Sequence, residues 1–249
     1  KNYMKKKIIS RKEFFINSEK FKKNITKNKK VQKLANSLMI ESDKENWAYQ
    51  HTWMNEPMLQ TPEDIIKFQE MIFQYKPKIL IEVGIAWGGL LLFLDSIKEK
   101  AKIKKIIGID IFIPDSLKNR LNKKISKDVK IFNSSSIDDK LILKLKRLIK
   151  NQRCLVHLDS NHTEEHVLKE LICYDKILKK NDLIIVGDTI INYIPNQKHR
   201  IREWNNKKNP KTALDKFLKI NKKYKIVKHL SNNLLLSNNY LGHIIKIKN

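Results

Sequence analysis

Acidic side chains follow two neighbouring predicted strands of this chain, and a histidine lies close behind one of them. Asp159 comes directly after the apolar run 154–158, and Asp188 follows the run 183–186. The carboxyl ends of parallel strands meet at one edge of a sheet, so we expect both carboxylates there. Two carboxylates form a hard-oxygen site that suits Mg²⁺ or Mn²⁺. Asp159 and His162 are the candidate catalytic residues, with His162 placed to take a proton from a bound hydroxyl.

A turn containing glycine follows another predicted strand, at residues 79–83. It reads Glu82-Val-Gly84-Ile-Ala-Trp-Gly88-Gly89. Glycine permits a tight turn and a close backbone approach to a ligand, and the helix that begins near Gly88 offers free N–H groups. A dinucleotide-binding turn needs G-x-G-x-x-G, which this spacing lacks. The wider loop favours S-adenosylmethionine over NAD, with Glu82, Gly84, Gly88 and Gly89 as contacts, and a turn without a ligand is the alternative.

Two further predicted strands bring polar residues to the same cofactor. Asp110 ends one of them, where its carboxylate can accept both ribose hydroxyls. Ser135, Ser136 and Asp138 follow the next strand and are placed to contact the adenine. Serine and aspartate are equally common as helix caps, so the capping alternative stays open.

The segment His162-Thr-Glu-Glu-His166 also fits H-x-x-E-H, the inverted zinc-peptidase pattern. That pattern would place both histidines on one helical face, with Glu165 as the base. Short patterns occur by chance, however, and this one follows a buried strand in a cofactor-binding layout. We therefore expect His166 to pack against its own helix.

The elements that position these residues alternate between strands and helices. Apolar runs predict strands at 79–83, 105–111, 129–132, 154–158, 183–186 and 224–227, with helices near 89–98, 138–150, 164–178 and 212–220. Strands separated by helices pair in parallel through right-handed crossovers. A last strand at 243–248 follows as in a hairpin. This order predicts an α/β, Rossmann-like class I methyltransferase fold, a seven-stranded sheet whose last strand is antiparallel.

The chain divides into an N-terminal extension, 1–60, and a methyltransferase domain, 61–249. Residues 1–33 are dense in lysine and predict a basic arm that is helical or partly disordered. Apolar spacing over 31–40 predicts an amphipathic helix that packs on the domain or on a second subunit of a homo-oligomer. Thr61 as N-cap and Pro62 at the first position predict a helix over 62–75.

Composition limits the function classes. Lys and Arg number 52 against 26 Asp and Glu, a formal charge of +26. Most of this charge comes from lysines spread along the chain, whereas arginine is the residue that makes bidentate contacts to phosphate and guanine. We therefore expect no nucleic-acid partner, and retain attraction to a phosphorylated small substrate. Without a long apolar run or a signal peptide, the expectation is a cytoplasmic protein with no membrane span. Cys154 and Cys173 are too few for a disulfide scaffold and should be reduced packing residues.

In their order and spacing, the motifs of this chain resemble one family. They are Trp53 to Pro57, Gln60 to Asp64, Gln69-Glu70, Ile81 to Gly84, Gly88-Gly89, Gly108 to Asp110, Ser135-Ser136, Leu158 to His162, His166 to Leu168, Gly187 to Thr189, Asn209-Pro210 and Ala213. From about Ser42 to the C-terminus the chain is similar to the cephalosporin hydroxylase and rhamnosyl O-methyltransferase family, related to macrocin-type O-methyltransferases. The resemblance implies S-adenosylmethionine as methyl donor, a divalent metal and methylation of a hydroxyl, often on a sugar.

The resemblance also implies residue roles, with two departures. It assigns the metal to Asp159 and Asp188 and the role of base to His162. Gly187 stands where the family has a glutamate next to the second aspartate, so one metal ligand is missing. Leu90 stands where a small hydroxyl residue often follows the glycine pair.

A long loop after the second acidic strand is expected to shape the acceptor pocket. In it, Arg200 and Arg202 offer phosphate or hydroxyl contacts, Trp204 offers a stacking surface, and Tyr193 lies nearby. Solvation at the surface is the alternative for these side chains.

The predicted function is a metal-dependent S-adenosylmethionine O-methyltransferase acting on a sugar hydroxyl, in a nucleotide-linked sugar or a glycan of a bacterial surface polysaccharide. One alternative is an accessory or binding subunit of a hydroxylase-like system without methyl transfer, motivated by Gly187. The other is an RNA methyltransferase, which rests on charge alone.

Overall fold

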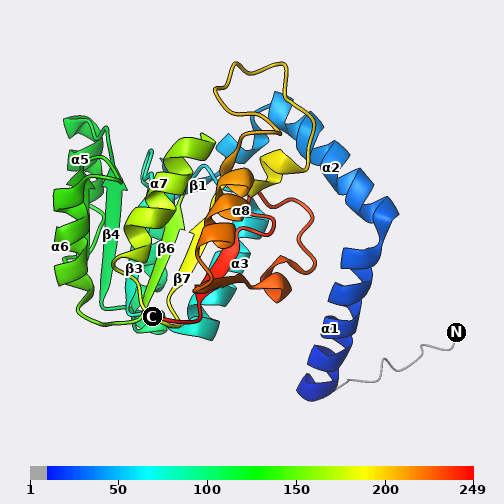
Figure 1. The fold of residues 1–249 in the computed structure, drawn as a ribbon, viewed down its shortest axis with the longest axis horizontal. Helices are drawn as coiled ribbons and strands as arrows, with labels where there is room; N and C mark the ends of the chain where they lie inside the picture. The colour runs from blue at the N-terminus through cyan, green and yellow to red at the C-terminus, as the bar shows by residue number, and fades with distance from the viewer. Residues whose placement is uncertain (1–9) are drawn as a thin grey trace, which may run out of the picture.

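The computed structural model describes residues 10–249 and contains a seven-stranded sheet between two layers of helices (Figure 1). The order across the sheet is β5-β4-β3-β6-β7-β9-β8. Its strands are β3 (Ile79–Val83), β4 (Lys105–Asp110), β5 (Val129–Asn133), β6 (Cys154–Leu158), β7 (Leu183–Val186), β8 (Tyr224–Ile226) and β9 (His243–Lys246). Only β9 runs antiparallel to its neighbours β7 and β8 within this sheet. The predicted class I methyltransferase fold is confirmed.

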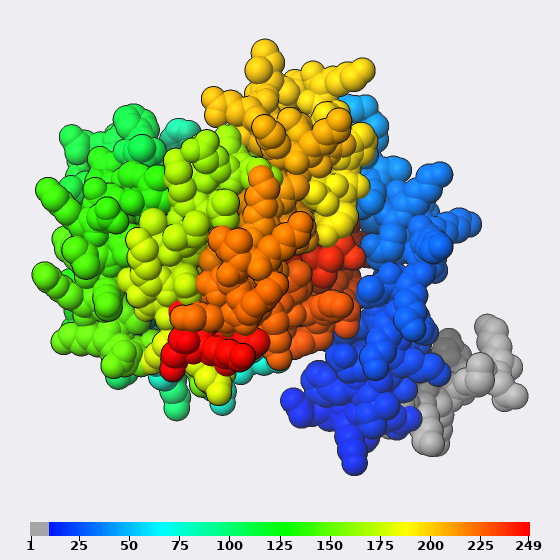
Figure 2. Space-filling model, viewed as in Figure 1, coloured from blue at the N-terminus to red at the C-terminus, as the bar shows by residue number. Residues whose placement is uncertain are grey.

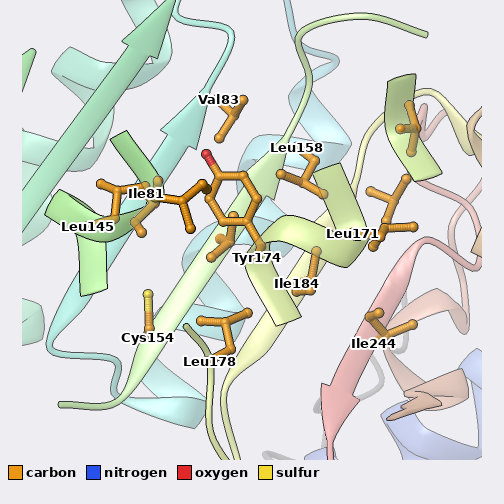
Figure 3. Close-up of a cluster of buried hydrophobic side chains, with 14 of the residues drawn as sticks. Ile81, Val83, Leu145, Cys154, Leu158, Leu171, Tyr174, Leu178, Ile184 and Ile244 are labelled. Atoms are coloured by element: carbon orange, nitrogen blue, oxygen red, sulfur yellow. The ribbon is translucent and has the colours of Figure 1, made fainter. Parts of the chain in front are cut away.

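Helices cover both faces of the sheet because the central strands are apolar on both sides. The helices of the domain are α3 (Pro62–Tyr75), α4 (Gly89–Ala101), α5 (Asp115–Asn122), α6 (Asp139–Ile149), α7 (Glu164–Asp175) and α8 (Pro210–Ile220). Helices α6, α7 and α8 pack on one face, where the fully buried ring of Tyr174 lies among Ile81, Leu158 and Leu171 (Figure 3). Helices α3 and α4 pack on the other. Burial on both faces explains why apolar runs rather than alternating patterns marked these strands.

The N-terminal extension forms an arm beside this body. It comprises α1 (Arg11–Lys27), α2 (Lys29–Lys44), a short 3₁₀ helix η1 (Trp47–Tyr49) and a small hairpin of β1 (Thr52–Trp53) and β2 (Glu56–Pro57). Figure 2 shows α1 and α2 as a ridge at the side of the body. Helix α1 buries none of its side chains, whereas α2 buries Ala35 and Met39 and leaves Leu34 and Leu38 exposed.

The remaining expectations concern the arm, the short helix α5, the two cysteines and membrane-spanning helices. The arm is helical from Arg11 onward, and residues 1–9 lie outside the described part of the chain. Helix α5 was not predicted, because its eight residues bury only Leu117 and Leu121. Cys154 and Cys173 are both free thiols, as expected. Across residues 10–249, no helix combines the length and hydropathy needed to cross a membrane.

Candidate active site

A cavity at the carboxyl edge of the sheet collects the acidic residues predicted to act together. We call it the acidic cavity. It is lined by Asp43, Glu82, Asp159 and Asp188, by His162 and Arg202, by Gln60, Trp47 and Tyr49, and by glycine-turn and apolar residues that include Gly84, Ala86, Gly89, Ile190 and Ile194. Its wall therefore comes from the ends of β3, β6 and β7 and also from the N-terminal extension. The expected convergence of Asp159, Asp188 and His162 on one cavity is found.

Two neighbours define the position of the Asp159 carboxylate: a hydrogen bond from Gln60 and the space left by Gly187. Gln60, which is buried just before the Thr61 N-cap of α3, donates from Nε2 to Asp159 Oδ2 at 2.6 Å. On the other side, a Cβ atom placed on Gly187 would lie 2.3 Å from Asp159 Oδ1. The carboxylate thus occupies the space that a side chain at position 187 would need. Gly187 stands where the family has a glutamate, and the Asp159 carboxylate lies where a side chain at this position would begin.

Asp188 and His162 form a pair beside this carboxylate. Asp188 has a left-handed φ of 51° at the start of the 3₁₀ helix η2 (Thr189–Asn192), which turns its side chain from the end of β7 into the cavity. Its Oδ2 lies 3.6 Å from His162 Nε2. Burial raises the pKa of Asp188, the nearby Asp159 adds to the rise, and His162 opposes it. The His162 ring also packs edge-on against Trp204, with centroids 4.9 Å apart.

These donors fit a loosely held cation rather than a closed metal cage. Within residues 10–249, no group of three or more His, Cys, Asp or Glu side chains is arranged to hold a metal ion. Mg²⁺, however, keeps several waters and is commonly bound through one or two carboxylates. Asp159 and Asp188 supply such a pair in a cavity that also has room for water. Burial is the main cause of the raised pKa of Asp188 and repulsion from Asp159 adds to it, and a bound cation would oppose both.

A second cavity adjoins the first, and we call it the serine cavity. It is lined by Asp110, Ser134, Ser135, Ser136, Asn161 and His166, and by Gly84, Ala86, Asp159 and Ser160, which it shares with the acidic cavity. Asp110 Oδ2 accepts the Ala86 N–H at 3.0 Å and Oδ1 accepts the Phe112 N–H at 3.1 Å. Asp110 therefore ties the glycine turn to the end of β4 and still borders the cavity.

Two residues expected in the cofactor site have other roles in the structure. Asp138 is the N-cap of α6 and accepts the Leu141 N–H at 2.7 Å, which is the capping alternative. Neither Asp138 nor Gly88 is among the residues that line the two cavities. Glu82 lines the acidic cavity rather than the serine cavity.

The glycines of the turn serve close chain packing. Gly84 has φ 91°, and a Cβ atom there would lie 2.2 Å from the Asp159 carbonyl oxygen. A Cβ atom on Gly88 would collide with a leucine of α5, and one on Gly89 would lie 2.4 Å from the Pro57 carbonyl oxygen. These glycines admit neighbouring segments, and Gly84 also borders both cavities and Gly89 the acidic cavity. Their contact with a cofactor stays a prediction.

Beneath the acidic cavity lies a buried pair, Glu82 and His157. His157 Nδ1 is 3.5 Å from Glu82 Oε2, and both side chains are almost completely enclosed. Burial lowers the pKa of His157, but the Glu82 carboxylate outweighs it and raises the pKa to about 9. Burial raises the pKa of Glu82, and His157 partly opposes the rise. Glu82 thus lines the acidic cavity while its Oε2 faces the buried His157 ring.

The zinc-peptidase alternative is not supported. His162 precedes α7, while His166 lies within it, so the two histidines do not share a helical face. His166 Nε2 lies 3.1 Å from Ser136 Oγ and 3.3 Å from Glu170 Oε1. Glu165 is exposed and pairs with Lys169. His166 thus packs on its own helix, as expected, and also borders the serine cavity.

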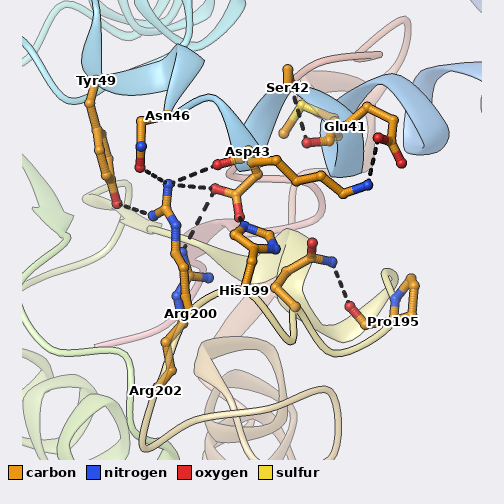
Figure 4. Close-up of polar contacts among 12 residues, drawn as sticks. Glu41, Ser42, Asp43, Asn46, Tyr49, Pro195, His199, Arg200 and Arg202 are labelled. Atoms are coloured by element: carbon orange, nitrogen blue, oxygen red, sulfur yellow. Dashed lines mark hydrogen bonds and ion pairs between the residues drawn. The ribbon is translucent and has the colours of Figure 1, made fainter.

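The four residues expected to contact substrate take different positions. Arg202 lines the acidic cavity, and Trp204 contacts His162. Arg200 is bound to residues of α2 and η1 (Figure 4). Tyr193 packs edge-on against Tyr240, and burial raises its pKa to about 12.

Two residues that line the acidic cavity, Gln60 and Asp43, were not among the predicted site residues. Gln60 was named only within the motif Gln60 to Asp64, and Asp43 belonged to no motif. Gln60 lies next to the Thr61 cap, and its proximity to Asp159 depends on how α3 packs against β6. Asp43 lies near the end of a lysine-rich helix, and its sequence context is typical of a solvated residue. No local pattern distinguishes either residue.

Comparison with known proteins gives a consistent result. Residues 45–247 match the model of the family described as Rhamnosyl O-methyltransferase/CmcI. The rhamnosyl O-methyltransferase of Mycobacterium leprae is 27% identical over 148 residues, covering 58% of this chain and 62% of that protein. That of Mycobacterium tuberculosis H37Rv is 28% identical over 151 residues, covering 58% of this chain and 59% of that protein. The match thus spans about three fifths of these relatives' length.

Solved structures share the fold at low identity. An apo structure of CmcI has a TM-score of 0.56 and 16% identity, covering 81% of this chain and 78% of that one. A CmcI structure with Mg and SAM has a TM-score of 0.54 and the same identity, covering 80% and 77%. A putative O-methyltransferase from Klebsiella pneumoniae has a TM-score of 0.51 and 7% identity, covering 86% and 90%. Since the family model spans most of the chain, this protein belongs to the Rhamnosyl O-methyltransferase/CmcI family.

Proposed function

We propose that this protein transfers a methyl group from S-adenosylmethionine to a sugar hydroxyl. The observation that carries the proposal is the wall common to the two cavities, formed by Gly84, Ala86, Asp159 and Ser160. A cofactor whose adenosine lies in the serine cavity can extend past these shared residues into the acidic cavity. The acceptor hydroxyl beside Asp159 and His162 then faces the sulfonium methyl. Methyl transfer is an in-line displacement, which depends on such positioning.

The residues of the acidic cavity have distinct tasks in this reaction. His162 takes the hydroxyl proton as the acceptor oxygen bonds to the methyl carbon and the sulfur–carbon bond breaks, which leaves S-adenosylhomocysteine. Asp188, 3.6 Å from His162 Nε2, stabilises the resulting imidazolium. Asp159 and Asp188 would hold a divalent cation, which supplies a lowered pKa for a bound hydroxyl. The Mg and SAM named for the related CmcI structure support a divalent cation and this cofactor.

The acceptor is best described as the sugar of a glycan. Trp47 and Tyr49 give the acidic cavity aromatic walls of the kind on which sugars pack. A nucleotide-linked sugar requires free cationic groups for its phosphates, but Arg200 is committed to α2 and η1. Four carboxylates line this cavity, which disfavours an anionic acceptor further. The name of the relatives, rhamnosyl O-methyltransferase, supports a neutral, deoxysugar-type acceptor.

The test is methyl transfer from labelled S-adenosylmethionine to a panel of neutral glycosides, nucleotide sugars and RNA. The expected result is transfer to a glycoside that stops with chelator and with His162→Gln. His229→Gln is the matched control, because His229 contacts Tyr75 away from both cavities. Cofactor binding by calorimetry without transfer to any acceptor would indicate an accessory protein. Transfer to RNA alone would replace the proposal with RNA methylation.

A further inference from the structure

One carboxylate of the N-terminal extension holds a basic loop of the domain. Asp43, near the end of α2, accepts from His199 Nε2 at 2.9 Å and lies 3.0 Å from Arg200 Nη2. Arg202 Nη2 approaches the same carboxylate at 3.8 Å (Figure 4). The four side chains are between 17% and 28% exposed. Because they form a network that is partly withdrawn from solvent, their interaction is screened less than an isolated surface pair.

Arg200 strengthens this attachment with further contacts to the extension. It donates to the Asp43 carbonyl oxygen at 3.1 Å, to Asn46 Oδ1 at 2.6 Å and to the Tyr49 hydroxyl at 2.9 Å. Its guanidinium also lies 4.8 Å from the centre of the Tyr49 ring. The donors of Arg200 are therefore directed at the extension.

The same loop continues to the residues of the proposed chemistry. Arg202 lines the acidic cavity, and its guanidinium lies 5.7 Å from the Trp204 ring centre. Trp204 in turn packs on His162. Between η2 and α8 this loop forms no strand or helix apart from one isolated bridge at 205–208, so side-chain contacts determine where it lies.

We propose that Asp43 is a positioning residue that acts on His162 through this loop. Its carboxylate binds His199, Arg200 and Arg202 and thereby keeps Trp204 packed against the imidazole of His162. The N-terminal extension is then part of the working active site rather than an appendage to it. The effect on turnover rests on the proposed function, whereas the effect on the loop does not.

Asp43→Asn tests this role because it keeps the shape of the side chain and removes its charge. Glu41→Gln is the matched control, since Glu41 lies two residues away on α2 and pairs only with Lys44 among the described residues. Asp43→Glu restores the charge. Hydrogen exchange of residues 193–204 and the Trp204 fluorescence, taken as the difference from Trp204→Phe, report the loop without turnover. Circular dichroism checks that each variant is folded.

In Asp43→Asn we expect faster exchange in the loop and a shifted Trp204 emission, both reversed in Asp43→Glu and absent in Glu41→Gln. With an acceptor in hand, kcat/KM should fall about tenfold while cofactor affinity is unchanged, because misplacement of a catalytic group by about 1 Å is enough for such losses. Unchanged exchange and emission in Asp43→Asn, or equal changes in Glu41→Gln, would overturn the proposal. Because both measurements need no acceptor, they decide it even if methyl transfer to sugars is not found.

Discussion

Gly187→Ala is the most direct perturbation of the proposed cation site. The added Cβ atom would lie 2.3 Å from Asp159 Oδ1 and 2.9 Å from its Cγ, whereas ordinary contacts begin at 3.4 Å. The carboxylate must therefore move by about 1 Å, against its 2.6 Å bond from Gln60. Gly187 does not have a left-handed φ, so alanine is compatible with its φ, and the next contact of the Cβ atom is the Leu158 carbonyl oxygen at 3.0 Å. Displacement of Asp159 is the direct consequence of the change.

The cost can be stated from these contacts. Overpacking costs about 1–3 kcal/mol. Weakening a hydrogen bond to a charged group adds about 1.5–3 kcal/mol if the bond is lost. If the displaced carboxylate binds the cation less well by about 1.4–2.8 kcal/mol, the affinity falls about 10- to 100-fold. We expect kcat/KM to fall by the same order and cofactor affinity to persist.

Mn²⁺ titration followed by electron paramagnetic resonance measures the affinity, and urea unfolding measures the stability of the same variant. Gly108→Ala is the overpacking control, because its Cβ atom on β4 would meet the side chains of Ile85 and of Leu91 on α4 and not the Asp159 carboxylate. The control should lose stability but keep its cation affinity. Wild-type Mn²⁺ affinity in Gly187→Ala would show that Asp159 does not hold a cation in the position described, and the reasoning would be refuted.

Four further outcomes follow from the same contacts. Gln60→Ala should lower cation affinity as Gly187→Ala does, because it frees the same carboxylate, and isothermal calorimetry measures the change. Asp188→Ala, like excess chelator, should abolish methyl transfer while calorimetry still detects cofactor binding. Burial raises the pKa of Asp64 from 3.8 to about 6. The stability that the protonated carboxyl contributes is therefore fully present below pH 3.8 and is lost as pH rises through 6, and Asp64→Asn should flatten this part of the urea-unfolding profile by up to about 3 kcal/mol. Glu82 raises the pKa of His157 from 6.5 to about 9 despite burial, so the stability that this pair contributes is present below pH 6.5 and lost as pH rises through 9. His157→Gln should remove this decline in the unfolding free energy. An equal decline in the variant would show that the titration of His157 does not cause it.

The order of elements was predictable because it depends on local patterns. Strands β3, β6 and β7 begin and end at the predicted residues, since each is a short apolar run bounded by polar residues. Helix α3 likewise begins after the Thr61 cap and ends at Tyr75, as predicted. Helix α5 was missed because few apolar residues in a short charged segment give no clear period. The capping role of Asp138 could not be distinguished from ligand contact by residue type.

By itself, the sequence determined the order of strands and helices along the chain and the position of Asp159, Asp188 and His162 just after strand ends, because local periodicity marks where each element begins and ends. Only the tertiary structure decided how those groups are held. Gln60 bonds to Asp159 across 99 residues of chain, and Arg200 bonds to the Tyr49 hydroxyl across 151. Such contacts depend on how separate elements pack, and a side chain carries no local mark of its distant partner. The placement of Asp159 over Gly187 has the same origin, because it depends on the distance between two strand ends.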